Sequence, residues 1–222
     1  MRVSAEGNEP PIPGSALSVE TLNVLPGEDV ESGSDDDDTM LLVFLGAADH
    51  PSGHASLLLA GERTGWKAGG GMAMLRATVG PEVDRHAALG PRERTVSLGV
   101  LDAESATGKR SFEVVFGPHN GSLRATMFVG HVPPGAAPWH YHLYDEIVWI
   151  WQGEGRFHTE EGTEPLGPGS AFRIRPREIH VVENTSPTDE LVVVGLFTPA
   201  GSPSAAYLAE DADVPYAIEA SS

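Results

Sequence analysis

The stretch that decides the fold is HYHLYDEIVWIWQG, residues 140–153. Side chains alternate along a β-strand, so His140 and His142 point to the same face and can present two imidazoles side by side. Glu146 begins the next apolar strand and can return a carboxylate to the same point, and Gly153 ends that strand at a turn. The pattern predicts two consecutive strands whose polar side chains meet.

A later segment, GSAFRIRPREIHVVEN at residues 169–184, supplies a third imidazole from His180. Three neutral nitrogens and the Glu146 carboxylate suit one divalent transition metal per chain. Fe(II) is our first choice, and Mn, Ni, Cu or Zn would fit the same ligand set. An octahedral ion would keep two positions open for other molecules.

The first of these segments resembles a motif of the cupin superfamily. That motif is a glycine, five residues, His-x-His, three or four residues, a glutamate, six residues and a glycine. The chain meets it from His140 through Glu146 to Gly153, although the leading Gly135 stands one residue too close.

The second segment resembles the other cupin motif, which ends in a histidine, three residues and an asparagine. Gly169, His180 and Asn184 hold their places in this motif. Arg175 and Arg177 replace the expected proline and glycine. These departures concern the geometry of a turn and leave the ligand set intact.

The resemblance implies an all-β fold, the cupin double-stranded β-helix or jelly-roll barrel, with His140, His142, Glu146 and His180 as metal ligands. It also implies a metal-dependent enzyme, first of all a non-haem metal dioxygenase or oxygenase similar to the quercetinase-like cupins, in which Glu146 is both ligand and catalytic proton acceptor. Two alternatives stay open. The metal could act as a Lewis acid in an isomerase, cyclase or decarboxylase, or the barrel could bind a small molecule without catalysis.

The rest of the chain reads as short strands joined by turns. With 26 glycines and 18 prolines in 222 residues, and no segment of sustained helical periodicity, the composition favours a β-sandwich or barrel. The predicted strands are Met40–Leu45, Ser56–Leu59, Met72–Arg76, Phe112–Phe116, Leu123–His131, His140–His142, Glu146–Trp151, Gly155–Thr159, Ala171–Ile174, His180–Asn184 and Leu191–Phe197.

A faint repeat at an offset of about 107 residues predicts a second, degenerate barrel. The segment 24–27 resembles 132–135, and 39–46 lies over 146–153, with Thr39 in the place of Glu146. We therefore expect a flexible arm over 1–18, a degenerate cupin-like domain over 19–100, the metal-binding barrel over 101–205 and an acidic tail over 206–222. Within the last part, Ala205–Leu208 is apolar enough to dock as a turn of helix.

Charge and composition exclude several classes of partner. The formal net charge is −18, which would repel nucleic acid and anionic membranes. The absence of cysteine excludes disulfides, thiolate metal sites and a cysteine nucleophile. The N-terminal residues have no apolar core of the signal-peptide kind, and no apolar stretch is long enough for a membrane span. We expect a cytoplasmic protein with a small-molecule substrate.

Alternation assigns the residues around the ligands to two faces. Val148 and Ile150 share the inward face of Glu146 and should form an apolar wall, whereas Ile147, Trp149 and Trp151 should pack against the first barrel or a homodimer partner. Further candidates for substrate binding are Tyr144 in the loop before Glu146, and Arg173 and Arg175, whose guanidinium groups suit carboxylates or phosphates. These arginines could equally pair with the chain's own carboxylates.

Overall fold

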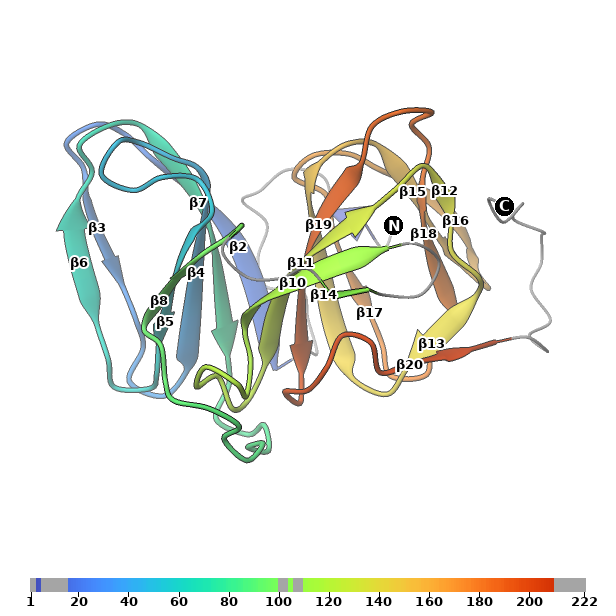
Figure 1. Cartoon of the computed structure of the whole chain (residues 1–222). Helices are drawn as coiled ribbons and strands as arrows, with labels where there is room; N and C mark the ends of the chain where they lie inside the picture. The colour runs from blue at the N-terminus through green and yellow to red at the C-terminus, as the bar shows by residue number, and fades with distance from the viewer. Residues whose placement is uncertain (1–2, 5–15, 100–103, 106–109, 210–222) are drawn as a thin grey trace.

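The structure is a computed structural model that describes residues 3–4, 16–99, 104–105 and 110–209 (Figure 1). Over these ranges all regular elements are β-strands, and every paired strand runs antiparallel to its neighbour. The all-β prediction is therefore confirmed. No helix in the described ranges is long and apolar enough to cross a membrane. Most of the expected arm and tail lies outside these ranges.

The second half of the chain folds into a barrel of two sheets. The larger sheet has the order β1 (Val3–Ser4), β17 (Ala171–Ile174), β14 (Asp145–Gln152), β19 (Leu191–Thr198), β11 (Thr126–Val132), β10 (Ser111–Phe116) and β9 (Glu104–Ser105). The smaller sheet has the order β16 (Gly162–Leu166), β15 (Gly155–Thr159), β18 (His180–Asn184), β13 (His140–His142) and β20 (Ala206–Leu208), with β12 (Gly135–Ala136) paired to β18. Phe157, Phe172 and Val182 belong to one buried cluster with side chains from both sheets. Their packing holds the barrel together.

The first half forms a smaller barrel. Its main sheet has the order β2 (Leu17–Val24), β7 (Met72–Val79), β4 (Asp38–Leu45), β5 (His54–Leu58) and β8 (Thr95–Ser97). The hairpin of β3 (Asp29–Ser32) and β6 (Thr64–Lys67) is a separate two-stranded sheet. Its buried Val30 packs with Leu41 and Met74 of the main sheet.

The two barrels repeat one pattern of strand pairing, as the faint sequence repeat predicted. The main sheet of the first barrel has the strand order β2-β7-β4-β5. The larger sheet of the second barrel has the matching order β11-β19-β14-β17. The register of β4 against β7 shifts between Val43 and Leu45, and that of β14 against β19 shifts between Ile150 and Gln152, 107 residues further along. A β-bulge is a designed feature of a strand, so its recurrence at this offset supports a duplication.

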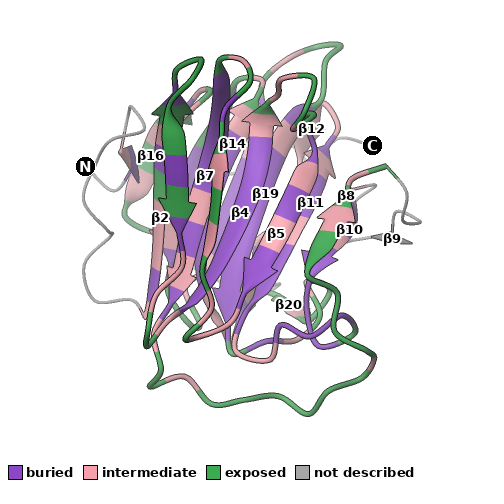
Figure 2. Ribbon diagram, turned by 90° about the vertical axis from the view of Figure 1, so that its left-hand side faces the viewer, coloured by how far each residue is buried: buried purple, intermediate pink, exposed green. Residues whose placement is uncertain are grey.

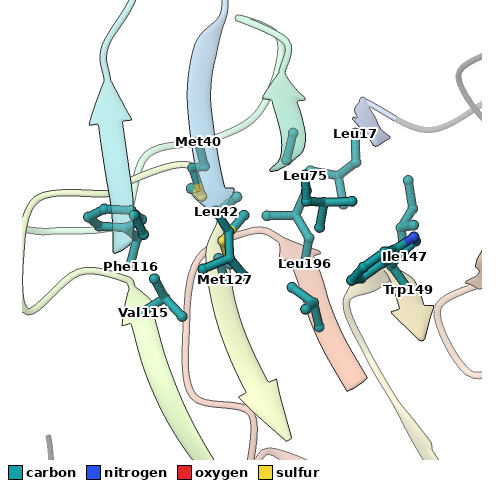
Figure 3. Packing of buried hydrophobic residues seen from close by; sticks show 14 of the residues in the cluster. Leu17, Met40, Leu42, Leu75, Val115, Phe116, Met127, Ile147, Trp149 and Leu196 are labelled. Carbon is teal, nitrogen blue, oxygen red and sulfur yellow. The ribbon is translucent and has the colours of Figure 1, made fainter. Parts of the chain in front are cut away.

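The largest hydrophobic core lies between the barrels and not inside either one. Leu42, Leu75 and Ala77 from the first barrel pack with Met127, Trp149 and Leu196 from the second (Figure 3). In Figure 2 the strands at the centre of the molecule, β4, β14 and β19, are largely purple, the colour of buried residues. The predicted outward face of β14 is therefore buried by the first barrel, and the Phe44 and Trp149 ring centres lie 4.8 Å apart.

Several strands lie where the sequence predicted none. β1 falls in the expected arm and pairs with β17, and β2 begins at Leu17. The segment 206–208, expected as a turn of helix, is the strand β20 instead. It lies antiparallel to β13, whose other edge pairs with β18. The open edge of β13 offers backbone hydrogen bonds that a helical turn could not make.

Candidate metal centre

The four predicted ligands come from three strands at one end of the second barrel. His140 and His142 lie on β13, and His180 opens β18 directly opposite His140. Glu146 stands near the start of β14 in the other sheet, between Phe197 of β19 and Ile174 of β17. Each of the four side chains is buried, with at most 6% of its surface exposed. The alternation predicted for β13 therefore brings both of its histidines inside the barrel.

Each of the three imidazoles is oriented by the same kind of hydrogen bond. Its Nδ1 lies 2.9 Å from a backbone carbonyl oxygen two residues away in sequence. A carbonyl can only accept a hydrogen bond, so Nδ1 carries the proton and Nε2 keeps its lone pair. The three pairs are His140 with Pro138, His142 with Tyr144, and His180 with Glu178.

The surroundings of the site favour the uncharged form of two of these rings, those of His140 and His180. Burial, together with the nearby positive charge of Arg110, lowers the pKa of His140 to about 4. Burial and the neighbouring histidines hold the pKa of His180 well below its ordinary value of 6.5. Both rings are therefore neutral near pH 7, which is the protonation state of a metal ligand.

One contact in the site needs a cation. Nε2 of His142 is buried without a hydrogen-bond partner, and it lies 2.9 Å from Oε2 of Glu146. In a neutral ring whose proton is on Nδ1, this contact places a lone pair against a carboxylate. Two neighbouring ligands on an ion about 2.1 Å away would be about 3 Å apart, so the pair fits a shared metal.

The three rings also lie close together. Ring centres are 4.4 Å apart for His140 and His180, and 5.0 Å for His142 and His180. As placed, however, no three His, Asp or Glu side chains of the described residues already enclose an ion. The chemistry of the donor set, three imidazoles and one carboxylate, suits a divalent metal. The assignment of the four ligands stays a prediction.

The ligands line one side of a cavity of about 100 Å³. Most of the other lining residues are apolar, and they come from both sheets of the barrel. They comprise Phe112, Phe128, Gly130, Val132, Val148, Ile174, Val182 and Val193. A space of this size admits a small organic molecule and excludes a polymer.

Arg110 is a cavity residue that the sequence did not single out. It immediately precedes β10 and lines the cavity together with the four predicted ligands. Burial lowers the pKa of its guanidinium below the ordinary value, and the negative charge of nearby Glu146 partly offsets this effect. It lies outside both cupin motifs, and nothing in the sequence marks an arginine at the head of a strand as buried.

Tyr144 stands between the ligands and the barrel wall. Its ring stacks on His142, with ring centres 3.9 Å apart and planes 8° from parallel, and on Phe197 at 4.0 Å. Burial raises the pKa of its phenol, so the hydroxyl stays protonated. That hydroxyl donates a hydrogen bond to the carbonyl oxygen of Pro203 at 3.3 Å.

The structure brings two of the predicted substrate-binding residues to the cavity and leaves three away from it. Tyr144 and Val148 line it. Ile150 shares the inward face but is fully buried in the hydrophobic core of the barrel. Arg173 points to the opposite face of β17 from the inward Phe172 and Ile174. Its guanidinium forms a bidentate ion pair with the Asp145 carboxylate, at 2.7 and 2.8 Å. Arg175 is exposed in the turn after β17.

The turn before His180 keeps the backbone expected of the cupin motif despite its different residues. Arg177, which stands in the place of the motif's glycine, has a φ of 66°. This left-handed conformation is strained for a side-chain-bearing residue. Its amide donates a hydrogen bond to the His142 carbonyl oxygen at 2.7 Å, which ties the turn to β13.

Comparison with known proteins identifies the second barrel. Residues 128–197 match the cupin domain family. The whole chain is similar to the structure of Lactobacillus farciminis oxalate decarboxylase in complex with formate, with a TM-score of 0.70 at 11% identity, over 87% of this chain and 79% of that one. No curated protein sequence matches the chain.

Two further structures have the same fold. Bacillus subtilis oxalate decarboxylase, in a study of its Mn(II) centres, gives a TM-score of 0.64 at 12% identity, over 88% of this chain and 72% of that one. Salicylate 1,2-dioxygenase from Pseudoaminobacter salicylatoxidans, with gentisate adducts, gives 0.64 at 10% identity, over 83% and 69%. At these identities the likeness shows the shared two-barrel fold and no more.

Proposed function

We propose that this chain, whose second barrel is a cupin domain, is a metal-dependent enzyme that acts on a small organic carboxylate. The observation that carries the proposal is the buried, unpaired Nε2 of His142 opposite the Glu146 carboxylate. A positive charge at this contact, such as that of a bound metal ion, would offset the buried carboxylate. The three oriented imidazoles supply the rest of the ligand set.

The metal ligands, Glu146 and the apolar walls have different roles in this proposal. His140, His142, Glu146 and His180 would hold a divalent metal, which when bound supplies open positions for small molecules and, if redox-active, one-electron chemistry with dioxygen. Glu146 accepts the proton of a substrate hydroxyl or enol at Oε1, the oxygen that does not face His142. The apolar walls exclude water from the reacting molecule.

Arg110 supports a carboxylate as the substrate's polar group. The positive charge of Arg110 offsets the negative charge of Glu146, and the rings of His140 and His180 are neutral. A bound divalent ion would therefore give the cavity an excess of positive charge. An anionic substrate restores the balance in this poorly solvated site. Formate, salicylate and gentisate, named with the similar structures, are all carboxylates.

Oxygenation is our first choice of reaction. Four protein ligands leave two positions on an octahedral ion, and a dry apolar cavity protects reactive species from water. Non-oxidative decarboxylation is the second candidate. Arg110 could hold the carboxylate, and Glu146, after accepting a proton from the substrate's hydroxyl, could return that proton to the carbon once its bond to CO₂ breaks. Iron, with manganese next, is the expected metal.

Metal content and gas exchange decide between these reactions. Purified protein should contain about one redox-active metal per chain, measured by plasma mass spectrometry. With a panel of aromatic and enolic carboxylates, an oxygenase consumes O₂, whereas a decarboxylase releases CO₂ without air. Tightly bound zinc alone would contradict the oxygenase. The absence of both gas signals over the panel would contradict the oxygenase and the decarboxylase.

Two sets of variants test the site itself. The double variant His140→Ala, His142→Ala should lose the metal and keep the circular dichroism of a folded barrel, and full occupancy would contradict the assignment. Arg110→Gln should weaken carboxylate binding by about 10- to 100-fold, because a charged hydrogen bond is lost. Arg175→Gln, at an exposed arginine, is the matched control and should leave binding unchanged.

A further inference from the structure

One wall of the cavity is built differently from the others. Residues 199–209, here named the lid, leave the end of β19 and return along β13 as β20. Pro203, Ser204 and Ala206 of the lid line the cavity. β20 pairs with the strand that carries two of the predicted ligands, with Ala206 opposite His142. In Figure 1, β20 runs beside β13 at the lower edge of the second barrel.

The lid lacks the apolar anchoring of the other walls. None of its residues from 201 to 209 is buried, whereas Phe112, Val148 and Ile174 on the other walls expose at most 4% of their surface. The stack of Tyr207 on Tyr141, with ring centres 5.3 Å apart, leaves Tyr207 half exposed. Segments with little buried apolar surface open at a lower free energy than the rest of a fold.

Besides the pairing of β20 with β13, hydrogen bonds hold the lid at its two ends. At one end, Gly201 both donates to and accepts from the hydroxyl of Thr126, a fully buried residue, at 3.0 and 2.9 Å. At the other end, the amide of Ala209 donates to the Trp139 carbonyl oxygen at 2.9 Å. The firm attachment at Gly201 makes it the natural hinge for the residues that follow.

Tyr144 connects the lid to the metal centre. Its ring lies flat on His142, while its hydroxyl donates to the Pro203 carbonyl oxygen in the lid. The position of Pro203 is therefore coupled, through one side chain, to a predicted metal ligand.

We propose that residues 202–209 open as a unit about Gly201 to admit metal and substrate, and that the Tyr144 hydroxyl latches them shut. Arg110 lines the same cavity as Pro203, Ser204 and Ala206 of the lid, so a carboxylate admitted by opening could reach the guanidinium. Closure of the lid would then remove water from the site.

Hydrogen–deuterium exchange tests the lid without metal or substrate, so its result is independent of the proposed function. In the wild-type protein the amides of Ala206 and Ala209 should exchange faster than those of β19. Tyr144→Phe keeps the ring stack and removes the latch, and should speed lid exchange about five-fold, the effect of one hydrogen bond. Tyr141→Phe is the control, because the Tyr141 hydroxyl has no hydrogen-bond partner in the described part of the chain. The proposal would be overturned if the lid amides exchanged as slowly as those of β19. It would also be overturned if Tyr144→Phe left the exchange rate of the lid amides unchanged.

A reversible lock tests whether opening is needed for access. Tyr141 and Tyr207 stand opposite each other on β13 and β20, and antiparallel partners lie about 4.5–5.5 Å apart at Cα, which suits a disulfide. The chain has no cysteine, so Tyr141→Cys with Tyr207→Cys gives a single crosslink. The oxidised protein should take up Co(II) at least ten-fold more slowly than the same sample after phosphine reduction. Equal rates would contradict the lid. Uptake in neither state would contradict the metal centre, while amide exchange would still decide the lid.

Discussion

Gly195 shows how much of the site depends on one missing side chain. It lies on β19 beside the cavity, paired with Val148 of β14 and Phe128 of β11. A Cβ at this position would lie 2.2 Å from the Phe128 ring and 2.8 Å from Oε1 of Glu146. The glycine therefore leaves the space in which the ligand carboxylate and the aromatic wall lie together.

We predict that Gly195→Ala displaces the Glu146 carboxylate and overpacks the barrel. The expected results are a loss of about 1–3 kcal/mol in the free energy of unfolding and at least a ten-fold loss of metal affinity. Thermal unfolding and Co(II) titration measure the two effects. Gly167→Ala is the matched control, since a Cβ there would meet nothing within 4 Å. Unchanged metal affinity in Gly195→Ala would show that the Glu146 carboxylate does not lie against Gly195.

The buried histidines give the metal-free protein a defined acid sensitivity. His140 titrates near pH 4 in the folded state and near 6.5 when unfolded. Between these values the unfolded chain binds a proton that the folded chain does not, so stability falls as the pH falls. The shift of His140 corresponds to about 3 kcal/mol, and that of His180 acts in the same direction.

Urea unfolding of chelator-treated protein from about pH 7 to about pH 4.5 measures this dependence. We expect the free energy of unfolding of His140→Asn to change less with pH, because most of the contribution of His140 is removed. His86→Asn, at an exposed histidine, should leave it unchanged. An identical pH dependence in wild type and His140→Asn would mean that His140 is not buried as a neutral ring.

At the scale of elements, β14 is the strand that contributes side chains both to the core of the second barrel and to the core between the barrels. Its inward residues, Val148 and Ile150, pack inside the second barrel, and its outward residues, Ile147 and Trp149, pack in the core between the barrels. The same strand carries Glu146 at its beginning. Because both faces are buried, the register of β14 is strongly constrained, and the carboxylate is placed with it.

Trp149→Ala should therefore cost about 3–5 kcal/mol of unfolding free energy, as for other large aromatic residues in cores. Chemical denaturation measures it. Leu45→Ala is the control, because Leu45 ends β4 with 61% of its surface exposed and its loss should change stability by no more than about 0.5 kcal/mol. A cost for Trp149→Ala as small as that of Leu45→Ala would contradict a common core.

At the scale of the whole molecule, the two barrels are joined by their largest core. Met40, Leu57 and Val79 of the first barrel, and Phe116, Met127 and Leu196 of the second, are buried in this one cluster. Separating the barrels would expose these apolar faces to water. The first barrel therefore stabilises the second, although Thr39 occupies the position that corresponds to Glu146.

We predict that both barrels unfold together. Calorimetry of the metal-free protein should show a single transition whose van't Hoff and calorimetric enthalpies agree. The variant Trp149→Ala should lower the transition temperature without splitting the peak. Two separate transitions in the wild-type protein would show that the barrels are independent domains joined by a weak interface.

Much of the fold could be predicted from the sequence because it follows from local rules. Strand alternation placed Val148 inward and Trp149 outward, and the structure confirms both assignments. Strands β13, β15 and β18 have the predicted bounds, and β13 and β18 contain the histidines of the two motifs. β2, in contrast, mixes polar and apolar residues and was recognised only through its pairing with β7.

The sequence by itself determined the donor set of the candidate centre, because two short motifs contain all four residues and their spacing. Only the tertiary structure decided what surrounds it. Arg110 precedes the motifs and reaches the cavity because β10 lies beside β11, while Pro203 follows the motifs and reaches it because the chain returns to β13. Arg173, which the sequence offered as a substrate ligand, instead pairs with Asp145. Contacts between distant segments depend on how the sheets close, and no local pattern of residues records that closure.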